Sequence, residues 1–402
     1  MKILVLNSGS SSQKSCLYEI GASLPEEPQH PLWEGKVEWR NGGAALAVHT
    51  SAGKKQSELL GKANRGEAID ALLKSLVAGE TQTLKQLPEI DAVGHRVVNG
   101  GRKFTKPTRI TPEVKTAIDG MAAFAPLHNR AELEGITQIE KACGAVPQVA
   151  VFDTGFHATL PDAAAIYPGP YEWAERGIRR FGFHGINHQY CAERAARLLR
   201  RDPSELKLVT CHLGNGCSLA AIRGGASVDT TMGFTPLEGL TMGTRSGSVD
   251  PGILTYLLRE DGLNGNSLDE LLNAKSGLLG ISGVSSDMRE IVAAMNAGNA
   301  RAKLAFEIFV HRLRAGIASM TASLGGLDAV VFTAGIGENS AEVRAAACEG
   351  LEFLGVRLDP KKNRERGRDR DIAAKDGRVR VLVIAAQEDW AIARECWRMQ
   401  RG

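Results

Sequence analysis

The chain has no apolar stretch that approaches the roughly 18 to 20 residues needed to span a membrane. Its first apolar run, residues 1–6, ends at Asn7 and is too short for the core of a signal peptide. Seven cysteines are scattered along the sequence, and Cys211 and Cys217, which flank one turn, lack a CxxC partner for a metal knuckle. These absences favour a cytoplasmic protein with reduced thiols.

The sequence also lacks a strong charge and two common nucleotide motifs. Its 49 basic and 46 acidic residues leave a net charge of only +3, with no long basic run, so nothing favours nucleic-acid binding. No GxxxxGK(S/T) occurs, which argues against a P-loop enzyme. Gly214-Asn215-Gly216 and Gly335-Ile336-Gly337 each lack the third glycine of a Rossmann GxGxxG. The second glycine pair can simply turn a strand into a helix, or its bare backbone can receive the adenosine part of a nucleotide.

The length and the pattern of apolar residues indicate two α/β domains. The 402 residues exceed the usual size of one core, and 43% apolar and 24% charged residues are ordinary for a globular protein. Strand and helix patterns alternate, which predicts mixed sheets covered by helices. We expect an N-terminal domain over 1–153, a second domain over 154–387, and a C-terminal helix, 388–402, that packs back on the first domain.

Individual elements follow from hydrophobic periodicity and from proline and glycine breakers. Helices are predicted at 68–76, 112–123, 131–143, 187–199, 251–259, 267–273, 301–324 and 390–397. Strands are predicted in a hairpin over 2–20 and at 90–98, 149–153, 329–333 and 379–384.

Residues 207–252 carry the clearest functional pattern. Two apolar strands flank the turn Leu213-Gly214-Asn215-Gly216, where the missing Cβ atoms let backbone N–H groups approach an anion. The polar stretch beyond it places Arg245 among glycines, serines and threonines, which suits a phosphate-like ligand better than a core. The stretch predicts a phosphate site.

The N-terminus repeats this arrangement. A short apolar strand runs into a Gly/Ser turn, so that Asn7 aligns with His212 and Gly9 with Gly214 about half a chain later. The repeat indicates two related domains that each offer a hairpin to one ligand between them.

Charged residues follow several predicted strands. Arg96 lies at the exit of one buried strand, Asp153 ends another, and Glu388 follows the last. Open α/β sheets bind ligands at such exits, and the two carboxylates could hold Mg²⁺ directly or through water, although solvated carboxylates are common there too.

For His184 and Asp287, a purely structural role is an alternative to a role in ligand or metal binding. His184 and His188 are four residues apart, as zinc ligands can be, but no glutamate lies between them as in HExxH, so a hydrogen-bonding His184 is favoured over a metal pair. Asp287, followed three residues later by Glu290, resembles the capped start of a helix.

Seven co-linear stretches, taken together, resemble the acetate kinase (acetokinase) family over essentially the whole chain. They are residues 7–12, 94–98, 152–157, 181–185, 212–216, 229–251 and 332–340. The resemblance implies the two-domain ASKHA fold of sugar kinases, actin and Hsp70, with a duplicated core and an active-site cleft between the domains. It further implies a homodimer and reversible transfer of the ATP γ-phosphoryl group to acetate, with Mg²⁺ or Mn²⁺ as cofactor, giving acetyl phosphate and ADP.

The same resemblance implies roles for individual residues. Catalysis falls to Arg96, Asp153, His184 and Arg245. Acetate contacts are Arg96, Val98, Leu127, Phe183 and Pro236, and metal contacts are Asn7 and Glu388. Contacts with ATP are Ser10, Ser12, Lys14, His128, His212, Leu213, Gly214, Asn215, Gly216, Asp287, Met288, Arg289, Gly335, Ile336, Gly337, Glu338 and Asn339.

This sequence departs from the family pattern at three places. Asn99 stands where a histidine is usual, Ile186-Asn187 where Thr-Ser is usual, and Gln387-Glu388-Asp389-Trp390 replaces Asn-Glu-Glu-Leu. These positions adjoin the implied site, so we expect them to affect substrate affinity or local packing.

The implied chemistry agrees with the residue types. A carboxylate is already ionised at pH 7 and needs no general base, whereas its approach to a phosphate is opposed by like charge. Two arginines, a cation and backbone N–H groups would offset that repulsion in a direct in-line transfer without a phosphoenzyme.

Three other activities remain open from the sequence. A kinase for propionate or another short acid would use the same phosphate residues, since one methylene changes binding by only about 1 to 3 kcal/mol. A nucleotide-gated binding protein of the actin/Hsp70 type would leave both arginines unexplained. A sugar kinase would require Asp153 to act as a base.

Overall fold

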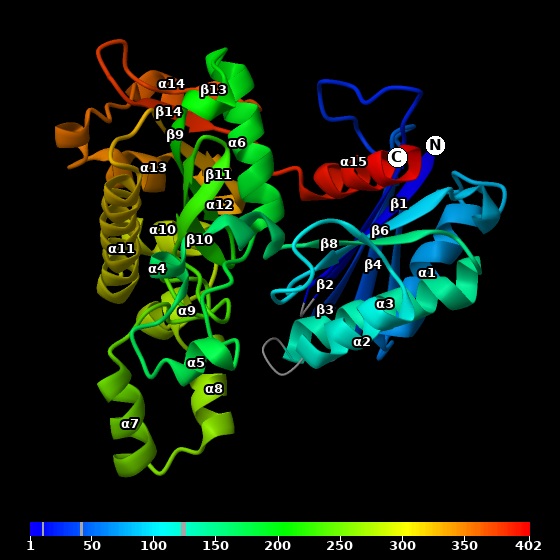
Figure 1. Ribbon diagram of the computed structural model, residues 1–402, viewed down its shortest axis with the longest axis horizontal. Helices are drawn as coiled ribbons and strands as arrows, with labels where there is room; N and C mark the ends of the chain where they lie inside the picture. Colours follow the sequence, from blue (N-terminus) through cyan, green and yellow to red (C-terminus); the bar gives the residue numbers. More distant parts are fainter. Residues whose placement is uncertain (10–11, 41–42, 122–125) are drawn as a thin grey trace. The chain divides into compact units, whose positions relative to one another are not determined.

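The computed structural model describes residues 1–9, 12–40, 43–121 and 126–402 (Figure 1). By its internal packing the chain divides into two compact units, Met1–Phe156 with Gln387–Gly402, and His157–Ala386. Each unit contains a mixed sheet with helices packed on it, which confirms the predicted α/β class. Over the described ranges, no helix is both long and apolar enough to cross a membrane.

The first unit is built on a sheet with the strand order β5-β4-β3-β2-β1-β6-β8-β7 among the described residues. Its strands are β1 (Lys2–Ser8), β2 (Ser12–Glu19), β3 (Trp33–Arg40), β4 (Gly43–Thr50), β5 (Lys55–Gly61), β6 (Ala92–Val97), β7 (Thr108–Arg109) and β8 (Gln148–Phe152). β1 and β2 form the predicted antiparallel hairpin, while β1, β6 and β8 run parallel. Parallel neighbours bring the carboxyl ends of β1, β6 and β8 to one edge of the sheet.

Helices cover both faces of this sheet. They are α1 (Arg65–Val77), α2 (Pro112–Gly120), α3 (Pro126–Cys143) and α15 (Glu388–Arg401). Side chains alternate along a strand, so Leu17 of β2 joins the core under α1 and α3, whereas its neighbour Tyr18 meets Trp390 of α15 edge to face at 5.5 Å. Gly94 lets α15 approach β6, because a Cβ there would lie 2.6 Å from Ile392.

The second unit has the sheet order β11-β10-β9-β12-β14-β13. Its strands are β9 (Lys207–Leu213), β10 (Cys217–Arg223), β11 (Ala226–Thr230), β12 (Ala329–Thr333), β13 (Arg370–Asp371) and β14 (Arg380–Val383). β9 and β10 form a hairpin, and β9, β12 and β14 run parallel. Both units therefore contain the same arrangement: an antiparallel hairpin, β1–β2 or β9–β10, whose first strand also pairs with a parallel strand, β6 or β12. The sequence repeat predicted this likeness.

The helices of the second unit include the longest of those described, α11. They are α4 (Asp162–Ala165), α5 (Glu172–Glu175), α6 (Gly185–Leu199), α7 (Pro251–Glu260), α8 (Gly265–Ala274), α9 (Gly277–Ser282), α10 (Met288–Asn296), α11 (Ala300–Leu324), α12 (Ala334–Asn339), α13 (Ala341–Cys348) and α14 (Pro360–Arg364). α11 packs on β10, where Gly316 permits close approach to Leu219, and α6 packs on β9 (Figure 1).

Several predicted boundaries were wrong. α15 begins at Glu388, as expected for the C-terminal helix over 388–402 but before the periodic pattern at 390–397, since two acidic residues in a first turn suit the positive end of a helix. α6 begins at Gly185 because His184 precedes it in a left-handed conformation, with φ of 58°. α9 was not predicted. The helix expected to reach residue 123 ends at Gly120, and residues 122–125 lie outside the described ranges.

Candidate functional site

Asn7, Arg96 and Asp153 meet at the edge of the first sheet. The guanidinium of Arg96 donates from Nε to Asp153 Oδ1 at 3.2 Å and from Nη2 to Oδ2 at 2.5 Å. Its Nη1 donates to Asn7 Oδ1 at 3.3 Å. Asn7 lies in β1, Arg96 lies in β6, and Asp153 directly follows β8. These residues are close together because the three strands are parallel neighbours. The structure thus brings together three residues that the sequence singled out separately.

The Arg96 guanidinium is surrounded by negative charge. Burial alone would lower its pKa, but the carboxylates of Asp153 and Glu388 outweigh burial and raise that pKa above its usual value. Arg96 is therefore a fixed cation at any working pH. A fixed, two-point geometry presents the remaining guanidinium edge in a defined direction, which suits recognition of a carboxylate or phosphate.

Asp389 joins this cluster, although the sequence did not single it out. Its Oδ1 accepts from Asn7 Nδ2 at 3.2 Å, and its Oδ2 pairs with the Lys14 ammonium at 2.7 Å. Burial would lower the pKa of Lys14, but Asp389 outweighs burial and raises it. The sequence cues were that Asp389 adjoins Glu388, which had been assigned to a metal, and that both lie in a stretch that departs from the family pattern.

Glu388 has an oxygen that could bind a cation. Its Oε1 is buried and makes no hydrogen bond within the described residues. In the same residues, no three His, Cys, Asp or Glu side chains are arranged to hold a metal by themselves. Mg²⁺ is commonly held by one or two protein oxygens and by phosphate oxygens, so an available Glu388 oxygen fits that ion better than a zinc-type cage.

The other predicted residues of the first unit are placed less completely. Ser12 opens β2, and its carbonyl accepts from the Gly9 amide at 2.8 Å. Val98 is buried directly after β6. Leu127 and His128 fall in the first turn of α3, but their side chains, like the whole of Ser10, lie outside what the structure describes.

In the second unit, the glycine turn between β9 and β10 is closely surrounded by side chains. A Cβ on Gly216 would lie 3.4 Å from the His184 ring and 3.5 Å from Arg245 Nη1, and a Cβ on Gly214 would lie 3.7 Å from His212 Nε2. The predicted phosphate turn therefore has His184, His212 and Arg245 beside it. Only glycine leaves this space open to an incoming anion.

The two predicted histidines at this turn are stacked. The His184 and His212 rings lie 3.9 Å apart, centroid to centroid, and are nearly parallel at 10°. His184 Nδ1 pairs with Ser218 Oγ at 2.9 Å, and His212 Nδ1 pairs with the Asn187 amide at 2.9 Å. Both rings are held from their Nδ1 side, so each orientation is fixed.

His188 does not form a metal pair with His184. It is fully buried, with Nδ1 paired to Thr210 Oγ1 and Nε2 to Ser218 Oγ, both at 2.7 Å. Burial lowers the pKa of His188 well below its usual value. It is a neutral core residue that supports the same serine as His184.

Phe183 and Pro236 adjoin the histidine and arginine. Phe183 is buried and precedes His184, and its carbonyl pairs with His157 Nε2 at 3.1 Å. Arg245 Nη1 donates to the carbonyl of Pro236 at 3.2 Å. One proline carbonyl thus orients the arginine that the sequence assigned to a phosphate site.

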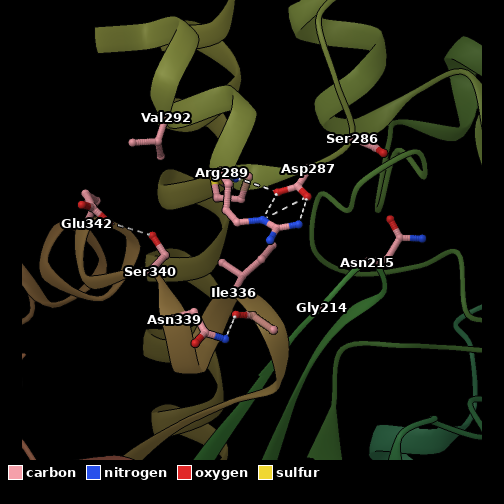
Figure 2. A pocket seen from close by; sticks show the side chains of 12 residues that line it. Gly214, Asn215, Ser286, Asp287, Arg289, Val292, Ile336, Asn339, Ser340 and Glu342 are labelled. Atoms are coloured by element: carbon pink, nitrogen blue, oxygen red, sulfur yellow. Dashed lines mark hydrogen bonds and ion pairs between the residues drawn. The ribbon is translucent and has the colours of Figure 1, made fainter. Parts of the chain in front are cut away.

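A cavity of about 600 Å³ opens beside this turn within the second unit. Its lining comprises Gly214, Asn215, Ser286, Asp287, Met288, Arg289, Val292, Gly335, Ile336, Asn339, Ser340 and Glu342. Eight of these residues had been assigned to ATP, whereas Ser286, Val292, Ser340 and Glu342 had not. The volume and the mixed lining suit a nucleoside. Figure 2 shows Arg289 and Ile336 among the side chains that line it.

Asp287 both caps α10 and orients Arg289. Its Oδ1 accepts from the Arg289 amide at 2.8 Å, and its Oδ2 pairs with the Arg289 guanidinium at 2.5 Å (Figure 2). The N-cap prediction is confirmed. The Asp287 amide donates to Ser285 Oγ at 3.0 Å, so the expected reciprocal bond with Glu290 is replaced by one within the preceding turn.

The short helix α12 is held by a residue that sequence reasoning missed. Arg344 is buried, and its Nη1 donates at 2.8 Å to the carbonyls of both Gly337 and Glu338. These are the last carbonyls of the helix, which have no partner within it. Glu338 in turn accepts from the Ala386 amide at 2.9 Å. Gly337 and Glu338 therefore shape the cavity wall from behind, while Gly335, Ile336 and Asn339 line it.

Comparisons with known proteins agree along the whole chain. The model of the acetokinase family matches residues 2–394. The acetate kinase of Gloeobacter violaceus is 60% identical over the full length of both chains. The crystal structure of Porphyromonas gingivalis acetate kinase is 41% identical, with a TM-score of 0.91 and 99% of each chain covered. A propionate kinase structure from Francisella tularensis is 39% identical, with a TM-score of 0.90 and 99% of each chain covered.

These comparisons confirm both the resemblance and the implied two-domain ASKHA fold. The family match spans nearly every element described above, including both hairpins and the glycine turn. The chain belongs to the acetokinase family.

Proposed function

We propose that this protein transfers the γ-phosphoryl group of ATP reversibly to acetate, giving acetyl phosphate and ADP. The observation that carries the proposal is the 60% identity, over its full length, to an acetate kinase. The residues around Arg96 in the first unit and around Arg245 in the second support it, because each set holds a guanidinium group that is suited to binding an anion.

In the first unit, Arg96 is assigned to the acetate carboxylate, with Val98 and Leu127 beside the methyl group. Asp153 keeps the guanidinium oriented by its two-point contact. Removing Asp153 would leave Arg96 free to adopt other rotamers. Acetate binding would then have to immobilise the Arg96 side chain, whereas in the native chain Asp153 already holds that side chain in place before acetate binds.

In the second unit, Arg245 and His184 are assigned to the transferring phosphoryl group, with Phe183 and Pro236 contributing to the acyl pocket. The Gly214–Gly216 turn and His212 are assigned to the phosphate chain, and the 600 Å³ cavity to adenosine. Charge that develops on the equatorial phosphoryl oxygens would be stabilised by donors already in place.

We propose that ATP binds with a divalent cation, Mg²⁺ or Mn²⁺, near Asn7 and Glu388. When bound, such an ion neutralises part of the charge on the phosphate oxygens. Glu388 supports this assignment through its buried oxygen that lacks a hydrogen bond among the described residues. E388Q should weaken the binding of Mn²⁺ in the presence of ADP, measured by electron paramagnetic resonance, and unchanged binding would remove Glu388 from the assignment.

The acceptor needs no general base. Acetate is ionised at neutral pH, so no proton has to leave the nucleophile. Asp153 is engaged by Arg96, which suits an orienting role rather than proton transfer. We infer a direct in-line transfer, in which the acetate oxygen bonds to phosphorus as the bond to ADP breaks.

A second acceptor, propionate, is favoured by one observation. The Francisella tularensis propionate kinase shares the fold at 39% identity. A pocket discriminates one methylene by only about 1 to 3 kcal/mol, so some activity on propionate is expected.

The deciding experiment traps acyl phosphate with hydroxylamine after incubation with ATP, Mg²⁺ and one acid at a time. We expect hydroxamate from acetate with the highest kcat/KM, less from propionate and least from butyrate. Hydroxamate from none of them would overturn the proposal. ATP hydrolysis indifferent to carboxylates would instead indicate a nucleotide-gated binding protein, and ADP release with hexoses a sugar kinase.

We further propose a cytoplasmic homodimer. Within the second unit, neither α7 nor α8 contains a buried residue, although α7 carries Ile253, Tyr256 and Leu258. Several large apolar side chains exposed on one helix are typical of a surface that contacts another protein chain. We assign this contact to the same face of a second copy of this chain, as a twofold dimer requires.

A further inference from the structure

Glu132 is a buried acid to which the proposed reaction assigns no role. It lies in α3 with 1% of its surface exposed. Its Oε1 accepts from the Val98 amide at 3.0 Å, while its Oε2 is buried without a hydrogen bond among the described residues. Burying a carboxyl group with one oxygen unsatisfied costs stability.

The charged groups that act electrostatically on Glu132 lie in three parts of the first unit. They are Arg96 of β6, Asp153 after β8 and Arg65 of α1. Burial raises the pKa of Glu132 to about 8, the Val98 amide and Arg96 oppose that rise, and Asp153 adds to it. Near neutral pH the side chain is therefore mostly a neutral acid, whose shape and hydrogen-bonding groups resemble those of glutamine.

The backbone that Glu132 contacts is the segment Val98–Gly101, directly after Arg96. Two residues further along, the Gly100 amide donates to Thr154 Oγ1 at 3.2 Å. Inside the segment, the Gly101 amide donates to Asn99 Oδ1 at 2.8 Å. Two side chains from other elements, Glu132 and Thr154, thus fix successive parts of this segment.

From this contact we propose that Glu132 is a positioning residue, which holds the Val98 backbone and through it the acyl-binding wall next to Arg96. The inference rests on the proposed function, in which Val98 contacts the methyl group of acetate. An amide without its acceptor would be left buried and unsatisfied, so the segment would rearrange to find another partner. The acyl pocket would change shape while the nucleotide cavity in the second unit would not.

The test compares E132A and E132Q with wild type in the hydroxylamine assay. We expect E132A to raise KM for acetate by about tenfold or more, with KM for ATP within twofold, because the lost interaction lies at the acyl wall. E132Q keeps an oxygen that can accept from Val98, so it should restore KM for acetate to within about threefold. E134A, at an exposed glutamate on the same helix, is the matched control.

In the kinetic assay, an unchanged KM for acetate in E132A, or an E132Q variant as impaired as E132A, would overturn the proposal. Should E132A fail to fold, E132M preserves the length of the side chain without an acceptor and carries the same expectation. Hydrogen exchange adds a measurement on the wild-type chain, where the Val98 amide should be protected, and rapid exchange there would also overturn the proposal. A wild-type chain that forms no acyl phosphate would instead refute the proposed function.

Discussion

Arg96 and Asp153 form a two-point ion pair between a strand exit and its parallel neighbour, with Nη2 and Oδ2 2.5 Å apart. The carboxylate is fully buried, so the pair is shielded from salt and from competing water. Removing Arg96 would leave the buried Asp153 carboxylate without its paired cation at the sheet edge. The Asp153 carboxylate therefore fixes the orientation of the Arg96 side chain before any substrate binds.

Replacing Arg96 by alanine should reduce turnover by roughly 10³-fold or more, as expected for an arginine that stabilises charge in phosphoryl transfer. The hydroxylamine assay at saturating ATP measures it. R102A is the matched control, because Arg102 is an exposed arginine of the following loop, and it should stay close to wild-type rates. Near-normal turnover in R96A would remove Arg96 from the mechanism.

Glu132 should make stability depend on pH. Its pKa is raised from 4.5 to about 8 in the folded chain, so between roughly pH 5 and 8 the unfolded chain has released a proton that the native chain retains. Stability from this group is consequently lost as pH rises through that window, by about 1.4 kcal/mol per pH unit. Urea unfolding of wild type and E132Q at pH 5.5, 6.5 and 7.5 measures it.

The advantage of E132Q over wild type in free energy of unfolding should grow with each step in pH, since glutamine does not titrate. A constant difference between the two chains would show that Glu132 ionises normally in the folded state.

The parts of the site that lie in local patterns could be predicted from the sequence. A glycine turn between two apolar strands is readable in a few residues, and so is a charged residue at a strand exit, such as Arg96 or Asp153. Parallel strand order then explains why such exits adjoin one another.

Residues whose role depends on long-range contacts could not be predicted in this way. Asp389 meets Asn7 across 382 positions, and Glu132 meets Val98 across 34. In the sequence both are ordinary helix acids, with the spacing of a solvated face. They are buried only because α15 and α3 pack on the sheet. Hydrophobic periodicity in the sequence does not indicate which acidic residues become buried in that way.

Arg344 should stabilise the second unit and its nucleotide cavity. It donates hydrogen bonds to the carbonyls of Gly337 and Glu338 and, from Nε, to Asn363 Oδ1 at 2.8 Å. R344M would leave these acceptors buried and unsatisfied, so we expect a loss of roughly 2 to 4 kcal/mol in urea unfolding. KM for ATP should rise more than KM for acetate.

R364M is the control for that change, because Arg364 is an exposed arginine at the end of α14 and should alter stability by less than about 0.5 kcal/mol. If R344M were as stable as R364M, the carbonyl contacts would contribute nothing to the wall of the cavity.

The proposed dimer predicts that charge on α7 separates the subunits. Ile253 and Tyr256 are 48% and 55% exposed and lie three residues apart on one face of the helix. The double substitution I253E/Y256E would place two carboxylates in an apolar contact and, by symmetry, four in the interface, so sedimentation should show a monomer. L59E, at an 85% exposed leucine of β5, should sediment like wild type. An unchanged sedimentation coefficient for I253E/Y256E would place the dimer contact elsewhere, and a monomeric wild type would refute the dimer itself.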